Sequence, residues 1–421
     1  MEKGDIIRAK ITDTNENGVG IAKHGGVVVF VPSLAAGDDS DIRITEMRKN
    51  YAIGETVQIY ESSEHRIAPV CSSCGECGGC SLAHVSYEYE NEIKRNTVIS
   101  ALRRAGLPYG NVSETVSAPT RTAYRNKVTV HFDKKTSVLG LYSEETHDAA
   151  AFRGCALCPD GFNEIISLLN CYGGMLGYME TEEITLKSSS DGKITIIIKA
   201  GKNTGDLARL IKDKFPSVGA VVPFDKAAEK HVAGEYGGLK MRFSAAGFRQ
   251  VNDEAFALLL SHVGELAGEE DFSSCADLYC GSGVIGLSLA ARYPDRQFYG
   301  VEINEKSIED AKYNADANGV KNISFFAGDA ASFRKNIPSD SLPSLVIVDP
   351  PRAGLSDKMR RELIALSPEK IIYVSCNPQT MARDAKELGD AGYGIKSVTP
   401  MNMFPMTKHT ESVMLLDKST K

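Results

Sequence analysis

The sequence contains no long hydrophobic run, although 42% of its 421 residues are hydrophobic. A membrane-spanning helix needs about 18 or more consecutive apolar residues, and no segment approaches that length. The opening residues, MEKGDIIRAK, also lack the apolar core of a secretory signal peptide. We therefore expect a cytoplasmic protein without a membrane-spanning segment.

The chain also lacks an excess of positive charge, since its formal net charge is −7. Binding to nucleic-acid phosphates depends on lysine and arginine, so this balance argues against a protein that only coats nucleic acid. Residues 92–135 differ, because they hold nine basic and three acidic residues. A solvated helix face accounts for half of this stretch, and the rest predicts an RNA-facing basic stripe. The basic residues are Lys94, Arg95, Arg103, Arg104, Arg121, Arg125, Lys127, Lys134 and Lys135.

Ten cysteines are present without a leader to an oxidising compartment. The cytosol keeps thiols reduced, so metal binding or catalysis is a better explanation for them than disulfides. Cys71, Cys77 and Cys80 have the spacing C-x5-C-x2-C, and the glycines among them let the backbone wrap around a bound group. Thiolates at this density bind zinc or an iron–sulfur cluster. Cys74 leaves a local four-cysteine site open, and the spacing does not choose the metal.

The length of the chain predicts two or three domains. Residues 1 to about 62 contain five strand-like segments, separated by turn signals such as Asn17-Gly18 and Gly25-Gly26. This pattern predicts a small antiparallel β-barrel, which either binds RNA or serves as a spacer. The expected strands cover residues 6–11, 18–22, 27–31, 40–46 and 56–62.

An amphipathic helix is expected from Ser86 to Ala105, because Gly106 and Pro108 then end the helical pattern. Strand-like and helical segments are mixed over the middle of the chain, which predicts an α+β domain. From about Gln250, helices, buried strands and glycine turns repeat. That rhythm predicts a parallel sheet covered by helices on both faces.

The first strand of this sheet ends in a glycine turn, DLYCGSGVIGL at residues 277–287. Such a turn lets a ligand approach the backbone and the following helix N-terminus, and Glu302 stands where it can accept hydrogen bonds from a ribose. Nicotinamide dinucleotides and S-adenosylmethionine both suit this geometry. The Asp349-Pro350-Pro351 turn after the fourth strand shapes a loop over a planar base, which favours methyl transfer.

Cys376 follows the fifth strand, in the stretch YVSCNPQT. A free cysteine is most often a small buried hydrophobe, but the tip of this strand lies above the ligand-binding edge of the sheet. Carbon 5 of a pyrimidine accepts a methyl group only after a nucleophile adds to carbon 6, and a thiolate supplies that nucleophile. Glu411, at the start of the last apolar strand, is the candidate base for the carbon 5 proton. A charged edge-strand residue is the alternative interpretation of Glu411.

These motifs together resemble the bacterial RNA uracil-5 methyltransferases, in the branch with an N-terminal TRAM domain and an iron–sulfur cluster. The resemblance spans nearly the whole chain and rests on the glycine turn and on GFRQVN (247–252), DPPRAG (349–354), SCNP (375–378) and FPMTKHTE (404–411). It implies that Cys376 is the nucleophile and Glu411 the base. It also implies S-adenosylmethionine as the cofactor. The cofactor and uracil pocket is then lined by Gln250, Tyr279, Gly281, Glu302 and Asp349.

The same resemblance implies a [4Fe–4S] cluster and, as the usual substrate, 23S ribosomal RNA. The implied cluster ligands are Cys71, Cys77, Cys80 and Cys155. Cys155 fits as the distant fourth ligand because Asn163 stands eight residues after it, as in the family pattern, whereas Cys74 and Cys158 have no counterpart there. No obligatory protein partner is predicted, and a monomer is expected.

The resemblance divides the chain into three domains. Residues 1–62 form the TRAM-like barrel, which binds RNA. Residues 63–90 and 118–246 form the α+β middle domain with the iron–sulfur site. Residues 91–117 and 247–421 form the Rossmann-like methyltransferase domain, because the helix that follows the cysteines joins that domain in this family.

Other functions remain open. A 5-methylcytosine RNA methyltransferase carries a second cysteine after the proline of the fourth-strand turn, and residues 349–351 have none. A radical enzyme needs an open iron, which a fourth cysteine ligand would close. A transfer RNA is the alternative substrate. A non-catalytic iron–sulfur RNA-binding protein explains the barrel and the cysteine cluster, but not Cys376 together with Glu411.

Overall fold

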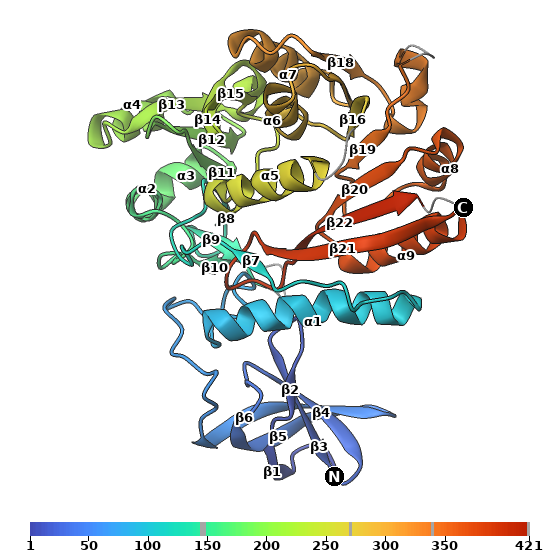
Figure 1. Cartoon of the computed structure of the whole chain (residues 1–421). Coiled ribbons are helices and arrows are strands. Elements are labelled where there is room, and N and C mark those ends of the chain that lie inside the picture. Colours follow the sequence, from blue (N-terminus) through green and yellow to red (C-terminus); the bar gives the residue numbers. More distant parts are fainter. Residues whose placement is uncertain (144–148, 269–271, 338–340, 419–421) are drawn as a thin grey trace.

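The computed structural model describes residues 1–143, 149–268, 272–337 and 341–418. Within them the chain forms a small N-terminal sheet, a middle sheet and a larger C-terminal sheet, with a long helix above the first of these (Figure 1). Each sheet has its own hydrophobic core. No helix of this described part is long and apolar enough to cross a membrane.

The N-terminal sheet has the strand order β1-β5-β6-β4-β3-β2. Its strands are β1 (Ile6–Lys10), β2 (Asp13–Thr14), β3 (Val19–His24), β4 (Val27–Pro32), β5 (Asp39–Met47) and β6 (Tyr51–Glu61). The five predicted strands are confirmed, but β6 begins earlier than expected and pairs in parallel with β4, so the sheet is not purely antiparallel. Gly54 permits the longer strand: a Cβ there would lie 2.4 Å from Ile42 Cγ2, so only glycine fits where β6 passes β5 and the register of the two strands shifts.

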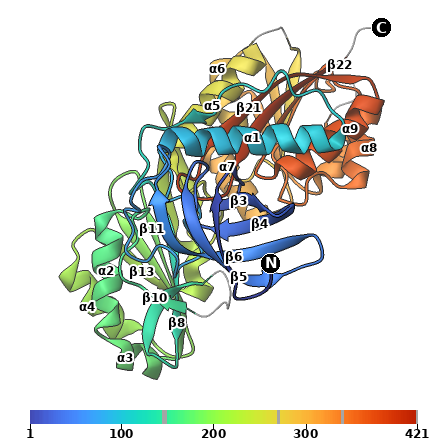
Figure 2. The same cartoon turned by 90° about the horizontal axis from the view of Figure 1, so that it is seen from below.

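Helix α1 (Tyr87–Ala105) packs against α9 (Pro378–Asp390) and lies over the N-terminal sheet (Figure 1, Figure 2). Ser86 caps its start, since Ser86 Oγ accepts a hydrogen bond from Tyr89 N at 3.2 Å. Gly106 ends the helix in the left-handed conformation, with a φ of 73°. The predicted helix and its stop signal are confirmed.

The middle sheet has the order β10-β9-β8-β11-β12-β13. Its strands are β8 (Lys127–Asp133), β9 (Val138–Tyr142), β10 (Ala149–Ala151), β11 (Thr181–Ser188), β12 (Ile194–Ala200) and β13 (Val218–Pro223). The accompanying helices are α2 (Asp160–Asn170), α3 (Gly173–Tyr178), α4 (Gly205–Lys214) and the 3-10 helix η1 (Phe224–Glu229). A hairpin of β14 (His231–Tyr236) and β15 (Leu239–Ser244) leads on to the C-terminal sheet. The predicted mixture of strands and helices is confirmed.

The C-terminal sheet has the order β18-β17-β16-β19-β20-β22-β21-β7. Its strands are β7 (Val116–Ser117), β16 (Ser274–Leu278), β17 (Gln297–Glu302), β18 (Ile323–Ala327), β19 (Leu345–Val348), β20 (Lys370–Ser375), β21 (Tyr393–Asn402) and β22 (Glu411–Lys418). Its other helices are α5 (Asp253–Gly268), α6 (Val284–Arg292), α7 (Glu305–Ala317), η2 (Ala330–Asn336) and α8 (Asp357–Leu366).

Helices cover both faces of this sheet. One core contains residues of α5, α6 and α7, and the other contains residues of α1, α8 and α9. Strands β16, β19 and β20 are therefore buried along their whole length, which explains the apolar sequence of β19 and the apolar middle of β20. The five strands β16 to β20 run parallel, and the strand order reverses between β16 and β19. Ligands of such sheets bind at this switch point, beyond the carboxyl ends of the strands.

Candidate active site

Cys376 and Glu411 meet at the carboxyl edge of β20. Strand β22 runs antiparallel to β20, with Ser375 opposite Ser412. Extending this register by one residue places Cys376 opposite Glu411. Ser375 Oγ accepts a hydrogen bond from Asn377 N at 3.1 Å and so fixes the turn around the cysteine. The structure thus brings together the two residues that the sequence singled out 35 positions apart.

Burial governs the ionisation of this pair. It raises the pKa of the Glu411 carboxyl well above its usual range, and the nearby Asp349 carboxylate adds to the shift. Burial, Glu411 and Asp349 also raise the pKa of the Cys376 thiol. Arg352 acts in the opposite direction on both pKa values. The acidic groups oppose one another's ionisation, and Arg352 is the cation that favours it.

A cavity at the switch point is lined by four of the five predicted pocket residues, Gln250, Tyr279, Gly281 and Asp349. Glu302 does not line it, but its carboxylate accepts a hydrogen bond from Gly281 N at 3.3 Å. Asp349 lines this cavity and also contributes to the electrostatic surroundings of Cys376, so the cavity and the Cys376 thiol are neighbours.

Several lining residues of this cavity escaped the sequence analysis. They include Phe248, Arg249, Phe256, Ser282 and Ser307. Phe248 is 74% exposed, although phenylalanine is usually buried. Its place in GFRQVN, two residues before Gln250, was the available signal, since strand-like and helical patterns both stop there.

The turn between β16 and α6 leaves this cavity open. Tyr279, Gly281 and Gly283 all have positive φ angles, of 67°, 53° and 82°. A Cβ at Gly283 would lie 2.7 Å from the Phe325 ring, so this position requires glycine. A Cβ at Gly281 would have no neighbour within 4 Å, so a ligand can approach the backbone there.

A second cavity, of about 250 Å³, borders Cys376 directly. Its walls come from distant parts of the chain: Asn17 in the turn before β3, Thr97 of α1, Gln379 of α9 and Lys408 before β22. We call it the outer cavity. No local pattern predicted it, because it forms only when the N-terminal sheet docks against the rest of the protein.

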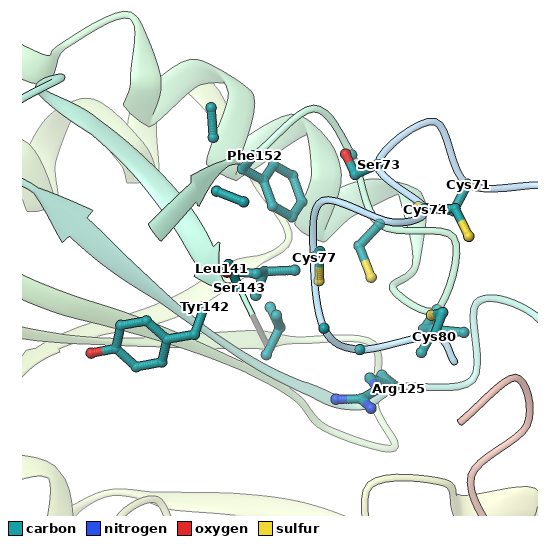
Figure 3. Close-up of a pocket in the computed structure, with 18 of the residues that line it drawn as sticks. Cys71, Ser73, Cys74, Cys77, Cys80, Arg125, Leu141, Tyr142, Ser143 and Phe152 are labelled. Carbon is teal, nitrogen blue, oxygen red and sulfur yellow. The ribbon is translucent and has the colours of Figure 1, made fainter. Parts of the chain in front are cut away.

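A third and larger cavity, of about 640 Å³, gathers cysteines (Figure 3). Cys71, Cys74, Cys77, Cys80 and Cys155 all line it. The structure therefore brings together the four predicted ligands and leaves Cys74 beside them. Burial raises the pKa of Cys77 and raises the pKa of Cys80 to about 12, and the neighbouring thiols add to both shifts. Within the described part of the chain, no three His, Cys, Asp or Glu side chains are arranged as a metal site.

The wall of the cysteine cavity carries hydrogen-bond donors without partners. Arg125 Nε and Ser73 Oγ are buried and have no hydrogen-bond partner, and both residues line the cavity (Figure 3). Such groups are costly unless something accepts their hydrogen bonds. The sulfides of an iron–sulfur cluster are acceptors, so the donors and the thiols both fit an anionic cluster.

Asn163 holds the distant cysteine in place. Cys155 N donates to Asn163 Oδ1 at 2.9 Å, and Asn163 Nδ2 donates to Cys155 O at 3.2 Å. Cys158 is buried and does not line the cavity. The spacing of eight residues that singled out Cys155 thus corresponds to a direct contact.

Comparisons with known proteins identify the family. A family model described as tRNA (Uracil-5-)-methyltransferase matches residues 231–419, and a TRAM domain model matches residues 1–57. An uncharacterized RNA methyltransferase of Caldanaerobacter subterraneus subsp. tengcongensis is 32% identical, with 100% of both chains covered. The chain belongs to the RNA (uracil-5-)-methyltransferase family. Another uncharacterized RNA methyltransferase, of Halalkalibacterium halodurans, is 29% identical over 99% of this chain and 98% of its own.

A solved structure shows how far the fold is shared. The tRNA (uracil-54, C5)-methyltransferase of Pyrococcus abyssi, in complex with S-adenosyl-L-homocysteine, has a TM-score of 0.74 and 23% sequence identity. The match covers 97% of this chain and 100% of that one. The fold of this RNA methyltransferase is therefore shared from its TRAM domain to its C-terminal sheet.

The predicted basic stripe of this RNA methyltransferase is wrong in part. Lys94 is buried at 1% exposure, and the Arg121 side chain is 16% exposed and paired with Glu90. Arg125 faces the cysteine cavity rather than solvent. The sequence does not distinguish buried cations from exposed ones, and Lys94, Arg121 and Arg125 make their contacts inside the fold.

Proposed function

We propose that this protein transfers a methyl group from S-adenosylmethionine to carbon 5 of a uridine in RNA, with 23S ribosomal RNA as the substrate. One observation carries the proposal: the register of β20 and β22 puts Cys376 opposite Glu411, close to Asp349 of the switch-point cavity. Membership of the RNA (uracil-5-)-methyltransferase family supports the reaction type.

Cys376 acts as the nucleophile. Its thiolate adds to carbon 6 of the uracil, and carbon 5 thereby becomes the nucleophilic end of an enolate. S-adenosylmethionine, when bound, would supply the methyl group to that carbon, with its sulfonium–methyl bond breaking to leave a neutral thioether. Glu411 then takes the proton from carbon 5, the C–H electron pair restores the C5–C6 double bond, and the Cys376 thiolate leaves. One methyl group has replaced one proton, and the thiolate is regenerated.

The surroundings of the pair suit these roles. A raised pKa makes the Glu411 carboxylate a stronger base than an exposed glutamate, which favours removal of a proton from carbon. Arg352 lowers the pKa of the Cys376 thiol and so favours the attacking thiolate. Burial opposes ionisation of both the Cys376 thiol and the Glu411 carboxyl. We infer that the uracil displaces the water that remains around these two groups when it binds.

We assign the switch-point cavity to the cofactor and the target base. The open turn at Gly281 and the Glu302 carboxylate beside it fit a nucleoside, because a carboxylate can accept hydrogen bonds from the ribose hydroxyls. Gln250, Tyr279 and Asp349 also line this cavity, and Asp349 is close enough to Cys376 to raise the pKa of its thiol.

An RNA substrate is supported by the outer cavity. It joins Cys376 to the Asn17 turn of the TRAM domain, so a nucleotide that reaches the thiol also touches that domain. A transfer RNA is the second candidate substrate. It is favoured by the description of the matching family model and by the Pyrococcus abyssi enzyme, which acts on uracil 54 of tRNA.

We propose that Cys71, Cys77, Cys80 and Cys155 hold a [4Fe–4S] cluster that shapes the middle of the chain for RNA. Methyl transfer involves no net redox change, so the cluster has no electron to supply. The protein is expected to act as a cytoplasmic monomer with three domains: 1–62, then 63–90 with 118–246, then 91–117 with 247–421. Pairing of β7 with β21 supports placing residues 91–117 in the last domain.

The experiment is to map 5-methyluridine in ribosomal and transfer RNA from strains with and without the gene. We expect loss of the modification at one or more sites of 23S ribosomal RNA, restored by the gene but not by a Cys376→Ser version. Loss confined to transfer RNA would support the second candidate. An unchanged 5-methyluridine map would contradict the proposed function.

A further inference from the structure

Two charged residues of α1 are buried although neither lines a cavity described above. Glu90 and Lys94 lie one helical turn apart, are 0% and 1% exposed, and form an ion pair of 3.3 Å. Taking two charges out of water is costly, and such pairs are retained where further hydrogen bonds satisfy them. Their remaining contacts therefore indicate what they do.

Lys94 holds both ends of the loop that leads into Glu411. We call residues 403–410, between β21 and β22, the preceding loop. Lys94 Nζ donates to Phe404 O at 3.0 Å, near the start of this loop, and to His409 O at 2.9 Å, near its end. A third hydrogen bond, of 2.7 Å, goes to Asn402 Oδ1. His409 stands two residues before Glu411, so one ammonium group fixes the path of the chain into the proposed base.

Glu90 holds the middle of the same loop. Its Oε1 atom accepts hydrogen bonds from Met406 N and from Asn402 Nδ2, both at 2.9 Å. Met406 has a φ of 65°, in the left-handed region that non-glycine residues seldom adopt. The surrounding structure must hold such a residue in place, and Glu90 supplies one of the bonds that do so.

The segment that contains the clustered cysteines, residues 71–82, also binds the preceding loop. Leu82 N donates to Met406 O at 2.9 Å, and Arg121 Nη2 links Leu82 O to Glu90 Oε2, at 3.2 and 3.0 Å. His409, at the far end of the loop, lines both the cysteine cavity and the outer cavity. The preceding loop thus contributes to the walls of two cavities, and hydrogen bonds to Glu90 and Lys94 connect it to α1.

The nucleophile does not depend on these bonds. Cys376 sits between β20 and α9, and its turn is held by Ser375 Oγ and by a 3.0 Å bond from Asn377 Nδ2 to Arg352 O. None of these hydrogen bonds involves Glu90 or Lys94. Loosening the preceding loop should therefore displace the base while leaving the thiol in position.

We propose that Glu90 and Lys94 are positioning residues for the base, and that they control release of the covalent RNA adduct rather than its formation. This inference rests on the proposed function, because it takes Cys376 as the nucleophile and Glu411 as the base. In the affected step Glu411 takes the carbon 5 proton, the C5–C6 double bond forms, and the carbon 6–sulfur bond breaks, returning the thiolate.

The test measures the two halves of the reaction separately. Lys94→Met removes the charge and all three donors but leaves Glu90 paired with Arg121, and the double variant Glu90→Gln/Lys94→Met removes both charges of the buried pair. Arg104→Met, an exposed position on the same helix, is the matched control. The substrate is RNA from a strain lacking the gene, with S-adenosylmethionine labelled in its methyl group.

We expect both Lys94 variants to form the covalent adduct within about threefold of the wild-type rate but to release product about tenfold to a hundredfold more slowly, as a displacement of about 1 Å would produce. The adduct should then accumulate on denaturing gels during turnover, with KM for RNA changed less than kcat. Arg104→Met should behave as wild type.

Glu411→Gln separates the two claims. If it traps an adduct while the folded double variant releases product at the wild-type rate, the positioning role is wrong and the proposed function stands. If neither the wild type nor Glu411→Gln forms an adduct, the proposed function itself fails. Equal slowing of adduct formation and release in the double variant would also overturn the positioning role, because it would indicate general damage to the fold.

Discussion

Gly18 offers a direct test of whether docking of the TRAM domain matters for RNA. It lies in the turn that carries Asn17 into the outer cavity, and its φ is +72°. A Cβ at Gly18 would lie 1.8 Å from Ser81 O, the carbonyl that follows Cys80, whereas ordinary contact begins at 3.4 Å. Gly18→Ala must therefore push the turn away from the cysteine segment.

The loss of folding free energy caused by Gly18→Ala has two parts. A left-handed alanine costs about 1–2 kcal/mol, and the clash adds about 1–3 kcal/mol, as other overpacked sites do. Gly26 allows the two contributions to be separated. It has a φ of +79° in the same domain, but a Cβ added there would have no neighbouring atom within 4 Å. Gly26→Ala should lose about 1–2 kcal/mol of stability only, whereas Gly18→Ala should also undock the turn.

The assay is steady-state methylation of RNA combined with cofactor binding. We expect Gly18→Ala to raise KM for RNA about tenfold, which corresponds to about 1.4 kcal/mol of the clash being expressed as lost docking. Cofactor affinity should stay within about twofold, because no residue of this turn lines the switch-point cavity and the interaction is local. Equal KM values for Gly18→Ala and Gly26→Ala, with both proteins folded, would refute the reasoning that the docked turn contributes to RNA binding.

Three further predictions concern the thiols. Cys376→Ser should lower methylation far more than tenfold while cofactor binding, measured by calorimetry, is retained. The rate of adduct formation should rise with pH through the raised pKa of Cys376; Arg352→Gln removes the cation that lowers this pKa, so its profile should move to higher pH, and a shift to lower pH would contradict the electrostatics. Anaerobically purified protein should contain about four irons per chain, with Cys155→Ser losing them and Cys74→Ser keeping them. Stoichiometric zinc in a colourless preparation would overturn the cluster.

Local patterns predicted the parts of the site that depend on strand ends. Buried strands and glycine turns recur regularly after residue 250, and right-handed crossovers then restrict the strand order. The tip of β20 had to lie at the ligand edge, and the last apolar strand had to start near it, so the sequence could place Cys376 and Glu411 close to one another. The same logic placed Asp349 and Gly281 in one cavity.

Features that depend on docking between distant segments were not predictable. Lys94 was assigned to a basic surface because sequence composition does not reveal which side of a helix is covered, and the three hydrogen-bond acceptors of Lys94 lie more than 300 residues away. The contact of the Asn17 turn with the Cys376 cavity depends on Gly18 fitting against Ser81, which no periodicity reports. The length of β6 depended on Gly54, which the sequence presents as a strand breaker.

Trapping of the covalent intermediate tests the central claim most directly. Glu411→Gln protein is incubated with S-adenosylmethionine and RNA from a strain lacking the gene, and the products are separated on a denaturing gel. The account predicts a stable protein–RNA adduct that contains the transferred methyl group and is absent when Cys376 is also changed to serine. Turnover by Glu411→Gln at the wild-type rate, or an adduct that persists without Cys376, would contradict it.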